Sequence, residues 1–245
     1  WYTELRFTRG LSRCGIFGFG NNTSVRDLYM RSEEVRREGS GNAFRQYFGT
    51  NSVIENVWAE HFGVGAWIAD YTAPYEVTDG LVIRNCRFRN TFADGVNLAR
   101  GTKNSIVENC HFRGNGDDSI ATWSSTTNLP MCLSNTFRYN TVECTYRAAG
   151  IGVFGGQDHR VHHNIVRDAI SGAGMRFNTT FSDGGYDFSA SGEMTVHANS
   201  LFRCGTLGGY APYEPYGAIN LTACYGDVRN ITFEDTIVDN VLNNG

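Results

Sequence analysis

The chain has 245 residues, of which 41% are hydrophobic and 19% are charged, a composition typical of folded globular or solenoid proteins. Its formal net charge of −4 offers no basic surface for a polyphosphate, so we expect no nucleic-acid partner. No apolar run approaches the roughly 20 residues that a helix needs to cross a bilayer, so we expect no membrane-spanning segment.

The counts of small and aromatic residues favour an all-β fold. There are 29 glycines but only 4 prolines, together with 12 tyrosines and 16 phenylalanines. Many short strands joined by tight turns account for these numbers better than helices do. No basic and apolar leader of the kind that directs secretion stands at Trp1, which indicates a mature chain or a fragment.

Taken in chain order, the sequence repeats a short strand-like unit. The strand-like segment 1–10 is followed by units that each carry a polar anchor residue, 24 to 35 positions apart for most of the chain. The anchors are Asp27, Asn56, Asn85, Asn109, Asn140, Asn164, Asn199 and Glu234. Apolar residues alternate with polar ones between the anchors, without helical spacing. Such a period predicts a stacked repeat architecture in which each unit is one coil of a parallel β-helix.

The anchors, the loops and the ends complete the predicted domain. An anchor asparagine suits a bend, where its amide can bond to the equivalent residue one coil away. Longer spacings predict loop insertions at 124–135, 181–191 and 207–216, which could wall a groove. Neither end shows the polar cap that a solenoid needs, so we expect one domain over 1–245 that is an incomplete portion of a longer solenoid.

The most informative stretch is 85–123, in which one pattern is written twice. Asn85-Cys-Arg-Phe-Arg returns 24 residues later as Asn109-Cys-His-Phe-Arg, and Asp118 likewise follows Asp94 by 24 residues. One turn of the repeat therefore places Asp94 next to Asp118, with Asp117 beside them. The cysteines of the two copies stack as well, and we favour buried thiols over a disulfide for them.

Counting from the anchors predicts which residues face outward on this part of the solenoid. The column of Val96, Ile120, Ile151 and Met175 is apolar on every coil and should face the core. The next column, which contains Asn97 and Arg176, then faces out, as does the column that contains Trp123 and Phe154. We therefore take Asn97, Trp123 and Arg176 as candidate substrate contacts on a groove floor. Trp123 and Arg176 could equally serve packing and a surface ion pair.

Strict alternation would bury Asp94 and Asp118, which would be costly without partners. The small residues that follow them, Gly95 and Ser119, mark a bend where alternation can fail, so that all three carboxylates reach one surface. Three interpretations of the cluster then compete. It could form an Asx turn, bind calcium, or perform acid and base catalysis with one crowded carboxyl kept protonated.

At these residues the sequence resembles glycoside hydrolase family 87, the α-1,3-glucanases (mutanases) and mycodextranases. The similarity covers most of the chain. Its motifs are WYTELRF near the start, ADGVN at 93–97, GNGDDSIATWS at 114–124, GIGVFGG at 150–156, SGAGMRFN at 171–178 and GAINLTA at 217–223. An aspartate followed after 23 and 24 residues by an aspartate pair, in this order on a β-helix, is the most specific of these features.

The resemblance implies a right-handed, pectin-lyase-like parallel β-helix that hydrolyses internal α-1,3-glucosidic bonds with inversion. It implies that Asp118 is the general acid and that Asp94 and Asp117 hold and activate the attacking water. It also implies a secreted enzyme whose partner is a neutral α-glucan. We expect a monomer that needs no cofactor or catalytic metal for its chemistry, although a structural calcium ion remains compatible with the sequence.

Other activities on the same fold stay open at this point. Polygalacturonases share the order of the aspartates, but their pattern also has a Gly-His-Gly on the next coil and an Arg-x-Lys after it. Here the next coil reads Ala149-Gly-Ile-Gly, and Arg176 stands without the lysine. An anionic uronide would require such cations, so a neutral glucan fits better. A calcium-dependent polysaccharide lyase with Arg176 as base, or a non-catalytic polysaccharide-binding module, are the further alternatives.

Overall fold

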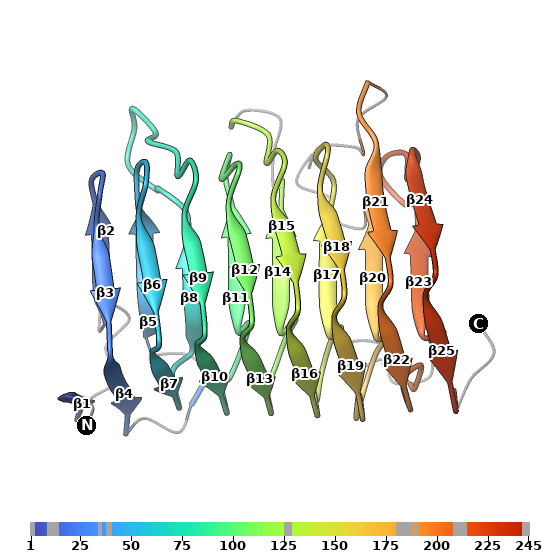
Figure 1. Cartoon of the computed structure of the whole chain (residues 1–245), viewed down its shortest axis with the longest axis horizontal. Coiled ribbons are helices and arrows are strands. Elements are labelled where there is room, and N and C mark those ends of the chain that lie inside the picture. The colour runs from blue at the N-terminus through green and yellow to red at the C-terminus, as the bar shows by residue number, and fades with distance from the viewer. Residues whose placement is uncertain are drawn as a thin grey trace.

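The computed structural model describes residues 3–8, 15–33, 36–37, 41–124, 129–179, 188, 191–207 and 215–241. In these residues the chain winds through three parallel sheets, A, B and C, visiting one strand of each per coil, so that the coils stand side by side from β1 to β25 (Figure 1). Each strand pairs with the strand three places later in the chain. This arrangement is the parallel β-helix that the repeat predicts.

The strands are short, and their bounds follow by sheet. Sheet A contains β1 (Thr3–Phe7), β4 (Leu28–Ser32), β7 (Trp58–Glu60), β10 (Arg87–Arg89), β13 (His111–Arg113), β16 (Thr141–Glu143), β19 (Ile165–Arg167), β22 (Ser200–Phe202) and β25 (Ile237–Asp239). Sheet B contains β2 (Ile16–Phe19), β5 (Asn42–Tyr47), β8 (Val64–Ile68), β11 (Val96–Ala99), β14 (Ile120–Trp123), β17 (Ile151–Phe154), β20 (Met175–Asn178) and β23 (Ile219–Thr222). Sheet C contains β3 (Ser24–Arg26), β6 (Val53–Glu55), β9 (Val82–Arg84), β12 (Ile106–Glu108), β15 (Thr136–Arg138), β18 (Arg160–His162), β21 (Met194–His197) and β24 (Ile231–Glu234).

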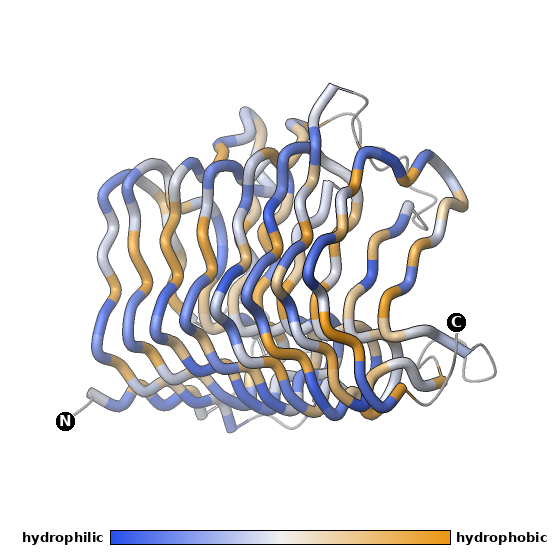
Figure 2. Tube along the Cα trace, turned by 45° about the vertical axis from the view of Figure 1, so that its right-hand side comes forward, coloured by the Kyte–Doolittle hydropathy of each residue, from blue (hydrophilic) through white to orange (hydrophobic). Residues whose placement is uncertain are grey.

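The core is built from columns of apolar side chains that repeat from coil to coil. Hydrophobic and hydrophilic residues alternate along each coil (Figure 2), and the hydrophobic ones turn inward. Val96 pairs with Ile120, and Ile120 with Ile151, and all three are fully buried. On sheet A, the rings of Phe88 and Phe112 stack at 5.4 Å. The predicted inward column on sheet B is therefore confirmed.

The anchor column differs from its prediction after the fourth anchor. Glu108 pairs with Arg138, which sets Tyr139 beside Asn109 and Asn140 one place further on. Asn85 and Asn109 have left-handed backbones at the predicted bend, but in the next coils this conformation belongs to Tyr139 and His163. The bend itself is kept, while the residue that forms it changes. The prediction of a single column of equivalent anchors is wrong here by one residue.

The later asparagines instead form a buried ladder. Asn140 Nδ2 donates to Asn164 Oδ1 at 3.0 Å, and Asn164 Nδ2 donates to Asn199 Oδ1 at 3.0 Å. In the two earlier coils Cys86 and Cys110 fill the same column as free, buried thiols, as favoured from the sequence. Asn140 continues the column directly, because its Oδ1 accepts the Cys110 amide at 3.0 Å. Coil-to-coil bonding of asparagine amides is thus confirmed, at this buried position.

No helix among the described residues is long and apolar enough to span a membrane. The predicted loops at 181–191 and 207–216 fall largely outside the described residues, as do residues 125–128 of the predicted loop at 124–135. The groove on sheet B is formed by the strands and by the described segments beside them.

Candidate active site

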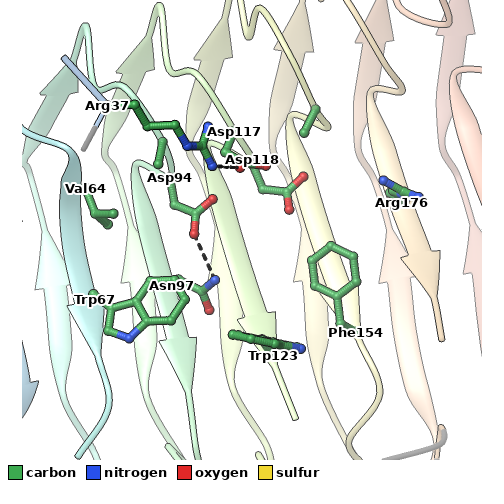
Figure 3. A pocket seen from close by; sticks show the side chains of 12 residues that line it. Arg37, Val64, Trp67, Asp94, Asn97, Asp117, Asp118, Trp123, Phe154 and Arg176 are labelled. Carbon is green, nitrogen blue, oxygen red and sulfur yellow. Dashed lines mark hydrogen bonds and ion pairs between the residues drawn. The ribbon is translucent and has the colours of Figure 1, made fainter. Parts of the chain in front are cut away.

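One groove on the outer face of sheet B collects all six candidate residues that the sequence identifies (Figure 3). Its volume is about 550 Å³. Asp94 stands just before β11, and Asp117 and Asp118 just before β14. Asn97, Trp123 and Arg176 come from β11, β14 and β20, respectively. The groove also contains Arg37 and Trp67, which the sequence analysis left out, and Phe154, which it placed on the outward column of Trp123.

A break in strand alternation turns the carboxylates outward. A Cβ atom added to Gly95 would lie 2.6 Å from the Phe112 ring of the core, so Gly95 faces inward, as its neighbour Val96 does. Two successive inward positions reset the alternation, and Asp94 and Asn97 then both face the groove. Ser119 occupies the same inward position on the next coil, where its hydroxyl bonds to Asn115 Oδ1 at 3.0 Å. The bend predicted from the small residues is therefore present.

The three carboxylates form one cluster whose nearest oxygen atoms lie within 4.8 Å of one another. Each also accepts a hydrogen bond from the protein. Asn97 Nδ2 donates to Asp94 Oδ2 at 3.0 Å, and the Ala149 backbone amide donates to Asp118 Oδ1 at 2.9 Å. Arg37 donates to Asp117 Oδ2 at 2.6 Å. These donors fix the direction of each carboxyl group.

Burial and crowding favour protonated forms of two of these groups. Asp94 is 7% exposed, and burial followed by the charges of Asp117 and Asp118 raises its pKa well above the ordinary value. Asp118 is 6% exposed, and burial followed by the charge of Asp117 raises its pKa to about 7, against the opposing effect of Arg176. A carboxyl group with this pKa can hold a proton near neutral pH and release it to a substrate oxygen.

The groove floor combines aromatic rings with a gap beside Asp118. The rings of Trp67 and Trp123 meet edge to face at 5.8 Å, and Trp123 pairs with Phe154 on the next strand. A Cβ atom on Gly152 would lie 2.9 Å from the Asp118 carboxyl group, so only glycine leaves this space open. A floor of this kind can stack on sugar rings while a bond of the sugar chain passes the carboxylates.

Arg37 and Trp67 were missed for different reasons. Trp67 pairs with Asn97 and so belongs to an outward column, but its register was undecided by one residue in the sequence. The anchors Asn56 and Asn85 are 29 residues apart, whereas Trp67 lies 30 residues before Asn97, so counting from the anchors puts Trp67 one position off. The remaining signal was its alternation with the inward neighbours Ala66 and Ile68. Arg37 reaches the groove from a segment between β4 and β5 that has no repeat pattern, so no sequence signal placed it there.

The same carboxylates form a group that could hold a cation, as one of the sequence interpretations requires. Oxygen ligands of this type suit calcium. The Arg37 guanidinium, bonded to Asp117, already supplies a positive charge to the cluster, and a second cation would be repelled by it. The donor set therefore fits proton transfer better than it fits a metal.

Comparisons with known proteins identify the family. The sequence profile of the family described as alpha-1,3-glucanase catalytic domain D2 matches residues 1–244. The solved Agl-KA catalytic domain shares 39% identity with a TM-score of 0.91, over 98% of this chain and 42% of that one. A search of the curated proteins found no match to the chain.

Two further solved structures are similar. The catalytic unit of a thermostable GH87 alpha-1,3-glucanase from Streptomyces thermodiastaticus strain HF3-3 shares 26% identity, with a TM-score of 0.71, over 90% of this chain and 42% of that one. A GH87 alpha-1,3-glucanase catalytic domain solved in complex with nigerose shares 25% identity, with a TM-score of 0.81, over 98% of this chain and 44% of that one. The chain thus spans less than half the length of each of these structures.

Proposed function

The chain belongs to the α-1,3-glucanase catalytic domain family of glycoside hydrolase family 87, and we propose that it hydrolyses internal α-1,3-glucosidic bonds of a neutral α-glucan with inversion. The observation that carries the proposal is the carboxylate cluster in the groove on sheet B. It holds one carboxyl group with a pKa near neutrality beside two others within 4.8 Å. Glycoside hydrolysis requires such a combination of acid and base.

Asp118 acts as the general acid. Its raised pKa keeps it protonated when the substrate binds, and the open space over Gly152 admits the glycosidic oxygen to its carboxyl group. As the bond between C1 and the leaving oxygen breaks, the proton moves from Asp118 to that oxygen. The Ala149 amide then stabilises the carboxylate that remains, through the hydrogen bond to Oδ1.

Asp94 and Asp117 hold the attacking water. One carboxyl oxygen of each lies within 4.8 Å of one of the other, close enough for a single water molecule to donate a hydrogen to both. Asp117 is the base that takes a proton as the water oxygen bonds to C1, because Arg37 stabilises its negative charge. Asp94, which is buried and bonded to Asn97, orients the water from the other side. The products are two sugar chains and a regenerated acid after proton exchange with solvent.

The spacing of the carboxylates alone would suit a retaining enzyme, in which the pair stands about 5 to 5.5 Å apart. Inverting enzymes commonly separate the two groups by about 6.5 to 9.5 Å to leave room for water. We propose inversion because two carboxylates, Asp94 and Asp117, are available to bind the water beside the acid. The anomer of the first product distinguishes the two mechanisms directly.

A neutral substrate follows from the charges in the groove. Of the two cations that line it, Arg37 is bonded to Asp117, and Arg176 lies on the far side of Asp118. The acidic cluster offers a uronide chain no cation of its own and would repel its carboxylates. Trp67, Trp123 and Phe154 instead offer apolar faces to the sugar rings of a glucan. Because such polymers are too large to enter a cell, we propose a secreted protein.

The decisive experiment incubates the protein with α-1,3-glucan, with and without a chelator, and follows the products by NMR. We expect saturated oligosaccharides whose new reducing ends have the inverted, β configuration, at a rate that the chelator leaves unchanged. Unsaturated products that require calcium would indicate the lyase alternative. Binding without turnover would indicate a non-catalytic module, and α-anomeric products would contradict inversion.

A further inference from the structure

We propose that Arg37 is a positioning residue for the reaction, which fixes Asp117 beside Asp118 so that Asp117 serves as the base and Asp118 as the acid. The inference rests on the proposed function and adds a residue to it that belongs to no strand of the solenoid. Arg37 lies 80 positions before Asp117, in a described segment of two residues between β4 and β5. Its side chain lines the groove beside the carboxylates.

The guanidinium group links two coils. One of its nitrogens, Nη2, donates to Asp117 Oδ2 at 2.6 Å, while the other, Nη1, donates to the carbonyl of Phe92 at 3.1 Å. Phe92 lies on the coil that supplies Asp94, and Asp117 lies on the next. Because the planar guanidinium group presents its donors in a fixed fork, it holds the Asp117 carboxyl group in a fixed direction relative to the coil of Asp94.

The charges around Asp117 make this contact necessary. The carboxyl groups of Asp94 and Asp118 lie beside it, Tyr146 lies near it, and the cations Arg147 and Arg176 act on Tyr146 and Asp118, respectively. Arg37 bonds directly to Asp117, and its charge also lowers the pKa of Asp94. Without that charge, the crowded cluster would hold protons more strongly.

The contact also bears on the acid. The Asp117 charge that Arg37 pairs with is the second cause, after burial, that raises the pKa of Asp118 to about 7. Arg37 therefore acts on the acid indirectly, through Asp117. Removing the Arg37 charge should raise the pKa of Asp94, which that charge lowers, and so move the pH dependence of the cluster upward.

A matched control exists on sheet C. Arg138 bonds to Glu108 at 2.7 Å, with side-chain exposures of 36% and 15%, whereas Arg37 and Asp117 have 35% and 15%. The two ion pairs are alike in length and burial, but Glu108 lies outside the groove. Arg138→Met therefore removes a similar ion pair without touching the carboxylate cluster.

The test measures kcat/KM on α-1,3-glucan against pH for the full chain and for Arg37→Met, Arg37→Lys and Arg138→Met. We expect Arg37→Met to move the acidic limb of the profile upward by about one pH unit, with kcat lowered by about 10-fold to 100-fold. Arg37→Lys should restore most of the limb position, because it keeps the charge. Arg138→Met should leave the profile unchanged.

Two outcomes would overturn the inference. If Arg37→Met lowers activity without moving the limb, or leaves both unchanged, Arg37 only shapes the groove or does nothing there. Circular dichroism and thermal melting of each variant identify a loss of folding, in which case Arg37→Lys alone decides by its limb position. If the unaltered protein fails to cleave α-1,3-glucan at all, the proposed function itself is wrong, which is a separate result.

Discussion

Two carboxyl groups of this protein are almost equally buried, yet they differ by about five pH units in where they titrate. Asp118 in the groove is 6% exposed and has a pKa of about 7, and Glu143 on sheet A is 4% exposed and has a pKa of about 2. Burial raises the pKa of both. At Glu143, hydrogen bonds from Arg167, His111 and Arg113 outweigh the burial. At Asp118, the nearest charge is another carboxylate.

The difference shows that burial alone does not decide the pKa of a carboxyl group in this solenoid. Glu143 is surrounded by cations from the two adjacent coils, His111 and Arg113 on one side and Arg167 on the other, and the result is a structural ion-pair network. Asp118 has another carboxyl group, Asp117, directly before it in the chain, and the result is a carboxyl group that keeps its proton near neutral pH. The charges that surround a buried carboxyl group therefore decide between the two outcomes.

The largest expected effect separates the two groups by activity. Asp118→Asn should lower kcat on α-1,3-glucan by about 10³-fold, because the acid is lost while the groove keeps its shape. Glu143→Gln should leave kcat within about twofold. Steady-state assays at pH 6 measure both. Comparable losses in the two variants would mean that the groove is sensitive to any change in the solenoid, and not to its acid.

A second prediction concerns stability at neutral pH. Glu143→Gln should lower the free energy of unfolding at pH 7 by about 2 kcal/mol, because three donors lose a charged acceptor. The pKa of Glu143 is lower in the folded state than its ordinary value of 4.5, so its contribution is present above pH 4.5 and is lost as the pH falls towards 2. In urea denaturation, the difference in free energy of unfolding between the unaltered protein and Glu143→Gln should be smaller at pH 3 than at pH 7.

Asp118 should behave in the opposite sense. Its pKa is raised from 3.8 to about 7 on folding, so the folded state loses stability as the pH rises through this interval. At pH 8, Asp118→Asn should therefore have a free energy of unfolding higher than that of the unaltered protein by on the order of 1 kcal/mol, and it should melt at a higher temperature. Below pH 4 the two proteins should be equally stable. Thermal melts across this range measure the effect. A lower melting temperature at pH 8 would contradict the raised pKa.

The smallest effect should come from a neutral donor. Asn97 donates to Asp94 and lowers its pKa, without the full charge that Arg167 brings to Glu143. Asn97→Ala should move the acidic limb of kcat/KM upward by roughly half a pH unit, because one neutral hydrogen bond contributes about 0.5 to 1.5 kcal/mol. The shift should be smaller than that of Arg37→Met. An equal or larger shift would indicate that Asp94 is the principal base.

Much of the fold and of the site was predictable because the repeat carries its own register. A 24-residue interval between two copies of one pattern placed Asp94 beside Asp118, and Gly95 indicated the bend that turns them outward. The anchors failed where the repeat became irregular. Tyr139 replaces an asparagine at the bend, and Asn140 enters the buried ladder. The left-handed backbone of the bend is held by several residue types in this chain, so asparagine alone did not mark it.

The sequence by itself determined the solenoid, its inward columns and the cluster of Asp94, Asp117 and Asp118, because these depend on periodic spacing along the chain. Only the tertiary structure decided what surrounds that cluster. Arg37 reaches Asp117 from 80 residues away through a segment without a repeat, and no periodicity encodes such a contact. The pKa of Asp118 likewise depends on burial, on the charge of Arg176 and on the Ala149 amide, which come together only after the coils have stacked.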